Sequence, residues 1–452
     1  MSTRQQFKLT LILSAPAMIA QLSSIMMQFI DAAMVGSLGA GPAASIGLVS
    51  TALWMFGSFC FAGAAGFYVQ VAHLIGANDF KSARSVLRQA MTSLLLLGLF
   101  LAATGICIGP YLPRWLGGNE SICADSSAYF MIMMAFIPAL QFEALCSGML
   151  QSSGNMKVPS ILNVLMCVLD VIFNFFLIFP TREIGGVTVW GAGLGVKGAA
   201  LGSGCAELVV VILFLYYILF QSKELKINHE RGSFIPTSKC LKNAASISLP
   251  MGLQSLVIRG ANVASTAIVA PLGTIAIAAN SFAITAESFC YMPGYGIGDA
   301  ATSLVGQSLG AGRKNLAKGF KRITLTEGIS IMSFLSVIMF FTAPWLIGLM
   351  SPEQAVIDLG AKVLRIECFA EAGFAAAIVG YAICVGAGDT LVPSFINFGS
   401  IWLVRIGLSL LLIPSLGLAG FWIAMCVDLN VRGLLFIMRL RGSKWMDKYK
   451  ND

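Results

Sequence analysis

The chain has 452 residues, of which 57% are hydrophobic and only 11% are charged, and its mean hydropathy is +0.83. Because about a quarter of the residues in a soluble domain are charged, this composition excludes an ordinary soluble protein. The formal net charge of +8 does not indicate a nucleic-acid partner, because most lysines and arginines fall on one side of the predicted membrane spans, as the positive-inside rule requires.

Many apolar stretches are long enough to cross a bilayer, which takes roughly 20 helical residues. Their apolar residues follow a helical period and do not alternate with polar ones, which excludes the strands of an outer-membrane barrel. We predict an all-α integral membrane protein with twelve transmembrane helices, six per half, near residues 9–35, 43–74, 86–109, 127–151, 159–180, 196–220, 243–270, 276–308, 322–349, 357–385, 392–413 and 417–440.

The segments that hold most of the lysines and arginines are predicted to lie in the cytoplasm, and they set the predicted topology. With these segments in the cytoplasm, the protein is a multi-pass protein of the plasma (inner) membrane with both termini cytoplasmic. The longest polar stretch, 221–242, is predicted to be a cytoplasmic linker between an N-terminal lobe, 1–220, and a C-terminal lobe, 243–440, which a cytoplasmic tail, 441–452, follows.

The second half of the chain repeats the first at a spacing of 234 residues. Pro250 falls on Pro16, Gly388 on Gly154, and Asn397 on Asn163. Each half has an even number of predicted spans, so the halves share one orientation and their pseudo-symmetry axis runs along the membrane normal. Many transporters are built from such halves.

Motifs for catalysis are missing from the sequence. The eleven cysteines stand singly inside apolar runs, which is typical of small core residues and not of disulfides or a metal site. Neither an HExxH motif nor a phosphate-binding loop occurs, so a membrane enzyme and an ATP-driven pump find no support. We therefore expect no enzymatic activity and no cofactor.

Several motifs, in order and on the appropriate spans, resemble those of multidrug and toxic compound extrusion (MATE) transporters, which are cation-coupled antiporters. The resemblance covers nearly the whole chain. It implies two pseudo-symmetric six-helix lobes that form a V around a central cavity opening alternately to each side. The residues that carry it are Pro16 and the segments 31–36, 38–39, 198–201, 287–294, 304–312 and 386–393.

Acidic residues inside the spans are the first candidates for function, because an ionisable group at bilayer depth is costly unless it is paired or hydrated. A carboxyl group near the middle of a span, such as Asp170, can bind and release a proton as access alternates. By the resemblance, Asp31 and Asp170 match the acidic pair of the family's N-terminal lobe, and Ser203 matches a hydroxyl position. Their repeat equivalents include Ser265 and Val404, so cation coupling is expected in the first lobe alone.

Structural roles compete with this assignment. Asp31 can instead cap a bent first helix near Gly36, and Asp170 can instead pair with an arginine. Pro16 removes a backbone hydrogen bond from the first span and permits a kink. This kink is either a hinge that responds to protonation of the aspartates or a fixed bend.

Proton coupling is favoured over sodium coupling. Archaeal and related members of the family place an asparagine four residues before the aspartate, where this chain has Met166. A sodium ion needs several oxygen ligands, and Met166 offers none. Asn163 and Asn174 can supply oxygens from other turns, so sodium stays the alternative.

A second cation or substrate site is predicted in the C-terminal lobe. The acids of the sodium-coupled branch fall near Ile258 and near Phe374, with Glu371 one turn before the latter, so this lobe departs from that pattern. Arg405 is predicted to pair with the acids of this lobe, and Asp428 with Arg432 four residues later. The candidates are Glu287, Glu367, Glu371 and Arg259.

Methionines and aromatic residues are predicted to line the substrate cavity. Methionine surfaces adapt to varied shapes, and aromatic faces attract organic cations. Ordinary packing is the alternative for most of them. The candidates are Met27, Gln28, Phe289, Tyr291 and Met292.

The sequence thus predicts a cation-coupled, preferably proton-coupled, antiporter that exports amphipathic, often cationic organic compounds by alternating access. The alternative is a flippase or exporter of lipid-linked or other amphiphilic metabolites. A flippase is expected to have a cationic cavity, whereas acids outnumber arginines within these spans. The expected partners are small organic substrates and the lipid bilayer, with no nucleic acid, and a monomer is expected.

Overall fold

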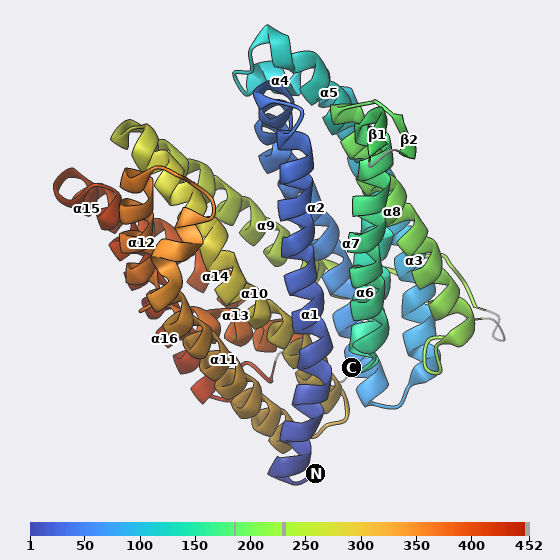
Figure 1. Cartoon of the computed structure of the whole chain (residues 1–452). Coiled ribbons are helices and arrows are strands. Elements are labelled where there is room, and N and C mark those ends of the chain that lie inside the picture. The colour runs from blue at the N-terminus through green and yellow to red at the C-terminus, as the bar shows by residue number, and fades with distance from the viewer. Residues whose placement is uncertain (185–186, 228–231, 448–452) are drawn as a thin grey trace. The chain divides into compact units, whose positions relative to one another are not determined.

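The computed structural model describes residues 1–184, 187–227 and 232–447, and helices account for most of them (Figure 1). The predicted linker residues 228–231 and the end of the predicted tail, 448–452, lie outside the described residues.

The first half contains α1 (Thr3–Gly36), α2 (Ala40–Gly76), α3 (Phe80–Ile108), α4 (Leu112–Trp115), α5 (Glu120–Ala135), α6 (Ile137–Ser152), α7 (Lys157–Ile178), β1 (Pro180–Ile184), β2 (Val187–Ala192), α8 (Val196–Tyr216) and a π-helical turn (Tyr217–Gln221).

The second half follows the same helical order. Two of its segments are short and are not α-helical: one is a tighter 3-10 turn and the other is a wider π-helical segment. It contains α9 (Ser238–Val269), a 3-10 turn (Ala270–Leu272), α10 (Thr274–Gly310), α11 (Lys314–Gly348), α12 (Gln354–Glu367), α13 (Glu371–Gly386), α14 (Leu391–Gly399), a π-helical segment (Ser400–Ile406), α15 (Gly407–Leu416) and α16 (Leu418–Arg441).

The helices confirm the all-α membrane protein that the hydropathy predicts. Within the described ranges, 10 helices are long and apolar enough to cross a membrane, or up to 12 if each of two bent pairs is one span. The predicted span 127–151 is the pair α5 and α6, bent by 44°, and the predicted span 357–385 is the pair α12 and α13, bent by 58°. Pro138, at the start of α6, has no N–H to continue the preceding helix, which accounts for the first bend.

A short hairpin between α7 and α8 is not among the predicted elements. Strands β1 and β2 pair antiparallel, with Arg182 opposite Val189. The Arg182 guanidinium lies 4.1 Å from the centre of the Phe179 ring, a cation–π contact. The hairpin lies at the same end of its packing unit as α4 (Figure 1).

Two packing units divide the chain, and the division falls inside α1 and α9. The C-terminal unit comprises Met1–Leu22 and Leu253–Asp452, and the N-terminal unit comprises Ser23–Gly252. The predicted lobes 1–220 and 243–440 describe membrane topology and stay a prediction. The packing units differ from them because the first part of each of these two helices packs on helices of the other half of the chain.

Close backbone contacts hold the first part of α1 and the first part of α9 against helices of the other half of the chain. A Cβ atom at Gly296 of α10 would overlap the backbone of Met18 in α1, and one at Gly66 of α2 would overlap the backbone of Ala244 in α9. Small residues allow such close approach of helices in membranes. The first helix stays helical through Pro16, and it passes from one unit to the other shortly after this proline.

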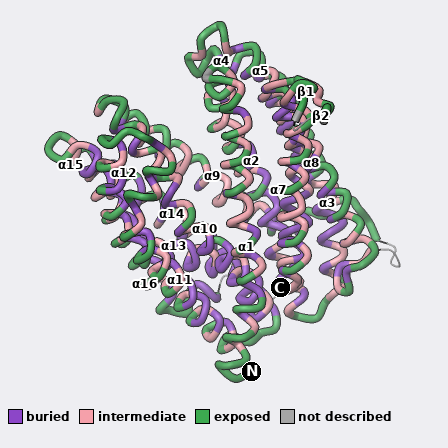
Figure 2. Tube along the Cα trace, viewed as in Figure 1, coloured by how far each residue is buried: buried purple, intermediate pink, exposed green. Residues whose placement is uncertain are grey.

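Each unit has its own apolar core. In the N-terminal unit, Leu87, Met149 and Phe214 pack together from α3, α6 and α8. In the C-terminal unit, Leu364 and Trp422 pack together from α12 and α16. Figure 2 shows the buried stretches that run along α10 and α13 of the C-terminal unit. Acidic side chains buried among these helices form the candidate sites.

Candidate cation site

The structure brings Asp31 and Asp170 together through Asn174. The Nδ2 group of Asn174 donates to Oδ1 of Asp31 over 3.0 Å and to Oδ2 of Asp170 over 3.1 Å. Asp170 and Asn174 are each 1% exposed and lie one turn apart on α7. The predicted acidic pair is therefore one hydrogen-bonded cluster inside the N-terminal unit.

The two aspartates also lie within hydrogen-bonding reach of each other. An ionised carboxylate only accepts hydrogen bonds, so a hydrogen bond between two carboxyl groups requires a proton on one of them. The arrangement of Asp31 and Asp170 is thus suited to holding a proton.

Small residues on α8 position Asn174. A Cβ atom at Gly202 would overlap Oδ1 of Asn174, and one at Gly198 would overlap the backbone at Leu177. This stripe of glycines lets α8 approach α7 closely, which confines the Asn174 amide to the direction of the aspartates.

The other predicted members of the site lie outside the hydrogen-bonded cluster. Ser203 is half-buried and follows Gly202 on α8, so its side chain projects from another side of that helix. Asn163 lies two turns before Asp170 on α7, and its buried Oδ1 atom has no hydrogen-bond partner within the described ranges.

Tyr129 is a member of the site that the sequence analysis missed. Its side chain, on α5, interacts electrostatically with both Asp31 and Asp170. It also packs with Val35 and Ile178 in a small apolar cluster. A tyrosine in an apolar span gives no signal of its own, and only the approach of α5 to α1 and α7 reveals this neighbourhood.

The structure also brings the predicted acids of the C-terminal unit together. Glu287, Glu367 and Glu371 are 5%, 0% and 1% exposed, and Glu367 interacts electrostatically with the other two. Neither oxygen of Glu367 or Glu371 has a hydrogen-bond partner in the described part of the chain. The three glutamates lie on α10, α12 and α13.

The arginines of this unit interact with its acids and its tyrosines. Arg405 donates from Nε to Oδ2 of Asp428 over 2.9 Å, and it also interacts electrostatically with Glu287 and Glu367. The predicted pair of Asp428 and Arg432 is present. Arg259 interacts electrostatically with the tyrosines Tyr291 and Tyr295.

The predicted cavity residues fall into two groups in different units. Met27 and Gln28 lie on the part of α1 that belongs to the N-terminal unit, and Gln28 is exposed. Phe289, Tyr291 and Met292 lie on α10 of the C-terminal unit, where Tyr291 packs 5.4 Å from the ring of Phe374.

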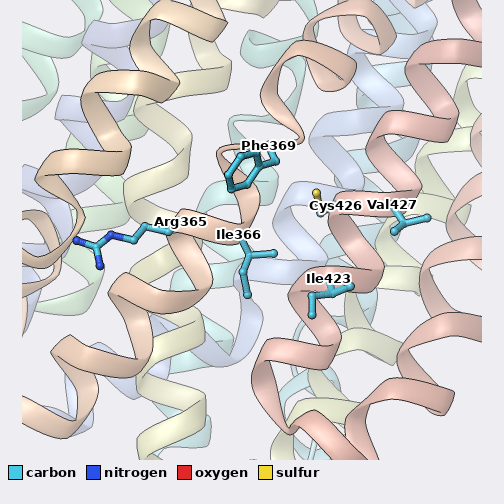
Figure 3. Close-up of a pocket in the computed structure, with 6 residues that line it drawn as sticks. All are labelled: Arg365, Ile366, Phe369, Ile423, Cys426 and Val427. Atoms are coloured by element: carbon cyan, nitrogen blue, oxygen red, sulfur yellow. The ribbon is translucent and has the colours of Figure 1, made fainter.

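A pocket of about 250 Å³ lies elsewhere in the C-terminal unit (Figure 3). It is lined almost entirely by apolar atoms and contains none of the predicted cavity residues. It lies where α12 bends towards α13 beside α16, and its walls are Arg365, Ile366, Phe369, Ile423, Cys426 and Val427.

A family model and curated relatives match most of this chain. The MatE family model matches residues 16–176 and 250–411, two segments that begin at the repeat-equivalent prolines. The chain is 24% identical to "Probable multidrug resistance protein NorM" of Thermotoga maritima over 439 residues, covering 96% of this chain and 92% of that protein. It is 22% identical to "Multidrug resistance protein MdtK" of Yersinia pestis over 449 residues, covering 97% and 95%.

Solved structures share the fold. The chain superimposes with a TM-score of 0.88 and 20% identity on an outward-facing multidrug resistance MATE family transporter of the MOP superfamily, covering 98% of this chain and 97% of that one. It superimposes with a TM-score of 0.88 and 18% identity on a MOP superfamily transporter from Pyrococcus furiosus, covering 96% and 95%.

Proposed function

We propose that this chain, which belongs to the MatE family, is a multidrug efflux transporter and not an enzyme. It acts as a proton-coupled antiporter that exports amphipathic, often cationic organic compounds by alternating access. The names of the relatives, which refer to multidrug resistance, support this class of substrate.

One observation carries the assignment of the coupling site. Asp31 and Asp170, on different helices, share the amide of Asn174 and lie within hydrogen-bonding reach of each other. A proton on this pair satisfies the hydrogen bond between the carboxyl groups, and its release leaves two like charges that separate most cheaply when the site opens to water. Loading and unloading of this pair is the proposed coupling step.

A proton is favoured over sodium as the coupling ion. Met166, at the position where related proteins offer an amide, packs against the apolar core of the N-terminal unit. The cluster therefore lacks one oxygen ligand that a sodium ion would use.

The remaining predictions complete the proposal. The transporter acts as a monomer in the plasma (inner) membrane with both termini in the cytoplasm, and it uses no cofactor besides the coupling ion. The side chains predicted above contact the substrate, those on α1 within the N-terminal unit and those on α10 within the C-terminal unit. Pro16 permits the first helix to bend. The buried glutamates of the C-terminal unit form a second cation or substrate site.

Transport into proteoliposomes tests the proposal. The purified protein is reconstituted, a pH gradient or a sodium gradient is imposed, and movement of the cationic dye ethidium is followed. We expect transport to follow the pH gradient and to be lost in Asp31→Asn and Asp170→Asn, whereas Asp358→Asn, at an exposed aspartate of α12, serves as the matched control. Transport that persists in both site variants, or that follows sodium alone, contradicts the coupling assignment.

A further inference from the structure

Two more glutamates lie buried in the N-terminal unit close to the proposed coupling site. Glu207, on α8, is 9% exposed and Glu143, on α6, is 7% exposed. Glu207 interacts electrostatically with both Glu143 and Asp170. It therefore connects the coupling site with a second acidic residue, and the coupling step described above uses neither glutamate.

Close helix packing brings α8, which carries Glu207, against the helices that carry these two acids. A Cβ atom at Gly202 of α8 would overlap Asn174 of α7, and one at Gly204 would overlap the ring of Phe136, where α6 begins. Glu207 lies nearly one turn after Gly204 and so on a similar side of α8. The same glycines that position the amide of Asn174 thus bring Glu207 near α6 and α7.

Helix geometry orders the acids along the membrane normal. Asp170 lies 13 residues after the start of α7 at Lys157, or roughly 20 Å along the helix at 1.5 Å per residue. Glu143 lies 9 residues before the end of α6 at Ser152, or roughly 14 Å. Because α6 ends and α7 begins on the same side of the membrane, Glu143 is nearer to that side, which is also the side of the N-terminus.

Two buried acceptors of this unit, one of them on Glu207, lack donors in the described part of the chain. Its Oε1 atom has no hydrogen-bond partner in the described part of the chain, and neither has Oε1 of Gln141, a residue that is 0% exposed. The Nε2 group of Gln141 donates to the backbone oxygen of Cys60 over 2.9 Å, and the Cys60 thiol interacts with Glu207. A buried acceptor that lacks a donor is costly, and a proton on the carboxyl group supplies one.

A stripe of polar residues leads from Glu143 to the end of α6. Ser147 and Gln151 follow at intervals of four residues, which places all three on one face of the helix. Gln151 donates from Nε2 to the hydroxyl of Ser147 over 3.3 Å, and α6 ends one residue later at Ser152. A serine hydroxyl both donates and accepts hydrogen bonds, so Ser147 can pass a proton on.

We propose that Glu207 and Glu143 form a proton relay that connects Asp170 with the membrane side on which the N-terminus lies. The proposal rests on the proposed proton-coupled function. In each step an O–H bond of one carboxyl group breaks as an O–H bond forms on the next, from Asp170 to Glu207 and then to Glu143, and the negative charge moves in the opposite direction. Water at the end of α6 takes up the proton through Ser147.

The titratable groups that interact with Glu207 and Glu143 include the two glutamates themselves, Asp170 and two thiols. Glu207 faces Glu143 from α6, Asp170 from α7 and Cys60 from α2. Glu143 faces Glu207 and also Cys146 on its own helix. These neighbours are acidic or neutral, so each transfer passes between groups of one chemical kind.

Simultaneous recording of protons and substrate tests the relay. The full-length protein is reconstituted in liposomes that contain a trapped pH-sensitive dye, and ethidium is the transported probe. We expect Glu207→Gln and Glu143→Gln to slow proton movement and pH-driven ethidium transport by roughly tenfold or more, because a glutamine cannot exchange a proton. Ethidium affinity stays within about twofold of the wild type in both variants, since the relay does not contact the probe. Glu207→Asp restores part of the rate, and Ser147→Ala has a smaller effect.

The controls separate the relay from the coupling site and from folding. Glu327→Gln, at a buried glutamate of the C-terminal unit, tests whether neutralising any buried glutamate slows transport. Size-exclusion chromatography and thermal unfolding show whether each glutamine variant folds. If either fails to fold, the rates of proton movement in Glu207→Asp and Ser147→Ala, compared with the wild type, test the relay instead. Wild-type proton movement in Glu207→Gln and Glu143→Gln, with loss of it in Asp170→Asn, overturns the relay alone. Wild-type transport in Asp170→Asn overturns the proposed function and the relay with it.

Discussion

Ser14 of α1 donates a hydrogen bond to Oε1 of Glu327 in α11, 313 residues later in the chain. Both residues are buried, at 0% and 6% exposure, and the other oxygen of Glu327 has no partner in the described part of the chain. The repeat equivalent of Ser14 is Ser248, whose hydroxyl donates to the backbone oxygen of Gly63 over 3.2 Å. Equivalent serines thus fasten the first part of each half's first helix to helices of the other half.

Removal of the Ser14 hydroxyl is expected to destabilise the C-terminal unit. Ser14→Ala leaves the buried carboxyl group of Glu327 without its donor, which costs about 1–3 kcal/mol. Thermal unfolding of the detergent-solubilised protein measures the effect. Thr10→Ala is the matched control, because the buried Thr10 hydroxyl donates to the backbone oxygen of Gln6 in its own helix. Equal unfolding temperatures in the two variants would show that the contact with Glu327 contributes nothing.

The glycine at position 202 is expected to be essential for the coupling site. Gly202→Ala introduces a methyl group where Oδ1 of Asn174 lies, and such overpacking costs about 1–3 kcal/mol. Both the unfolding temperature and the pH-driven transport rate should fall. Gly47→Ala, in the helix α2, has open space around the added Cβ atom and should lower neither quantity, because alanine favours a helix over glycine. A Gly202→Ala protein with wild-type transport would exclude tight α7–α8 packing as a requirement.

Asn174 is expected to matter through its two hydrogen bonds. Asn174→Ala removes the amide that joins Asp31 and Asp170, and the loss of two charge-assisted bonds should slow pH-driven transport by roughly tenfold or more. Initial rates in proteoliposomes measure this. The control is Asn430→Ala, whose amide donates to the backbone oxygens of Cys426 over 2.9 Å and of Phe369 over 3.3 Å, with no acid among these partners. Equal rates in the two variants would remove Asn174 from the site.

Asp428 is expected to be the most sensitive acidic residue for stability. It accepts hydrogen bonds from Ser400, Arg405 and Arg432, so Asp428→Ala leaves two arginines without their buried counter-charge. Loss of one member of a buried ion pair costs about 3–5 kcal/mol. The yield of folded protein by size-exclusion chromatography should therefore collapse, whereas Asp358→Ala, at the exposed surface of α12, should leave the yield unchanged.

The helix cap at Asp79 gives a pH-dependent prediction. Hydrogen bonds from the side chain and backbone of Ser82 hold the pKa of the Asp79 carboxyl below its ordinary value. The unfolded chain therefore binds this proton more readily, so the cap stabilises the protein fully at neutral pH and stops doing so as the pH falls through the lowered pKa. Asp79→Ala should cost about 1 kcal/mol at pH 7 and progressively less below about pH 4. If Asp79→Ala lowers the stability as much below about pH 4 as at pH 7, Asp79 does not act as a helix cap.

Much of the fold and part of the site follow from local patterns in the sequence. A span must satisfy its backbone within itself, so hydropathy and helical period suffice to predict the helices. A lone acid in an apolar span is costly, so Asp31 and Asp170 are recognisable without a structure. The bridging role of Asn174 and the neighbourhood of Tyr129 are not, because they depend on the faces that α5, α7 and α8 present to one another.

The sequence by itself determined the membrane class, the repeat, the family resemblance and the acids to examine, because composition, spacing and breaker residues are properties of short segments. Only the tertiary structure decided that the first part of α1 packs with the C-terminal half, that Asp428 has two arginines as partners, and that Glu207 interacts with both Asp170 and Glu143. The physical reason is that how closely two helices pack depends on where a glycine of one helix faces the other helix, as at Gly202 and Gly296. Such a contact involves residues that are far apart in the sequence, so no short segment predicts it.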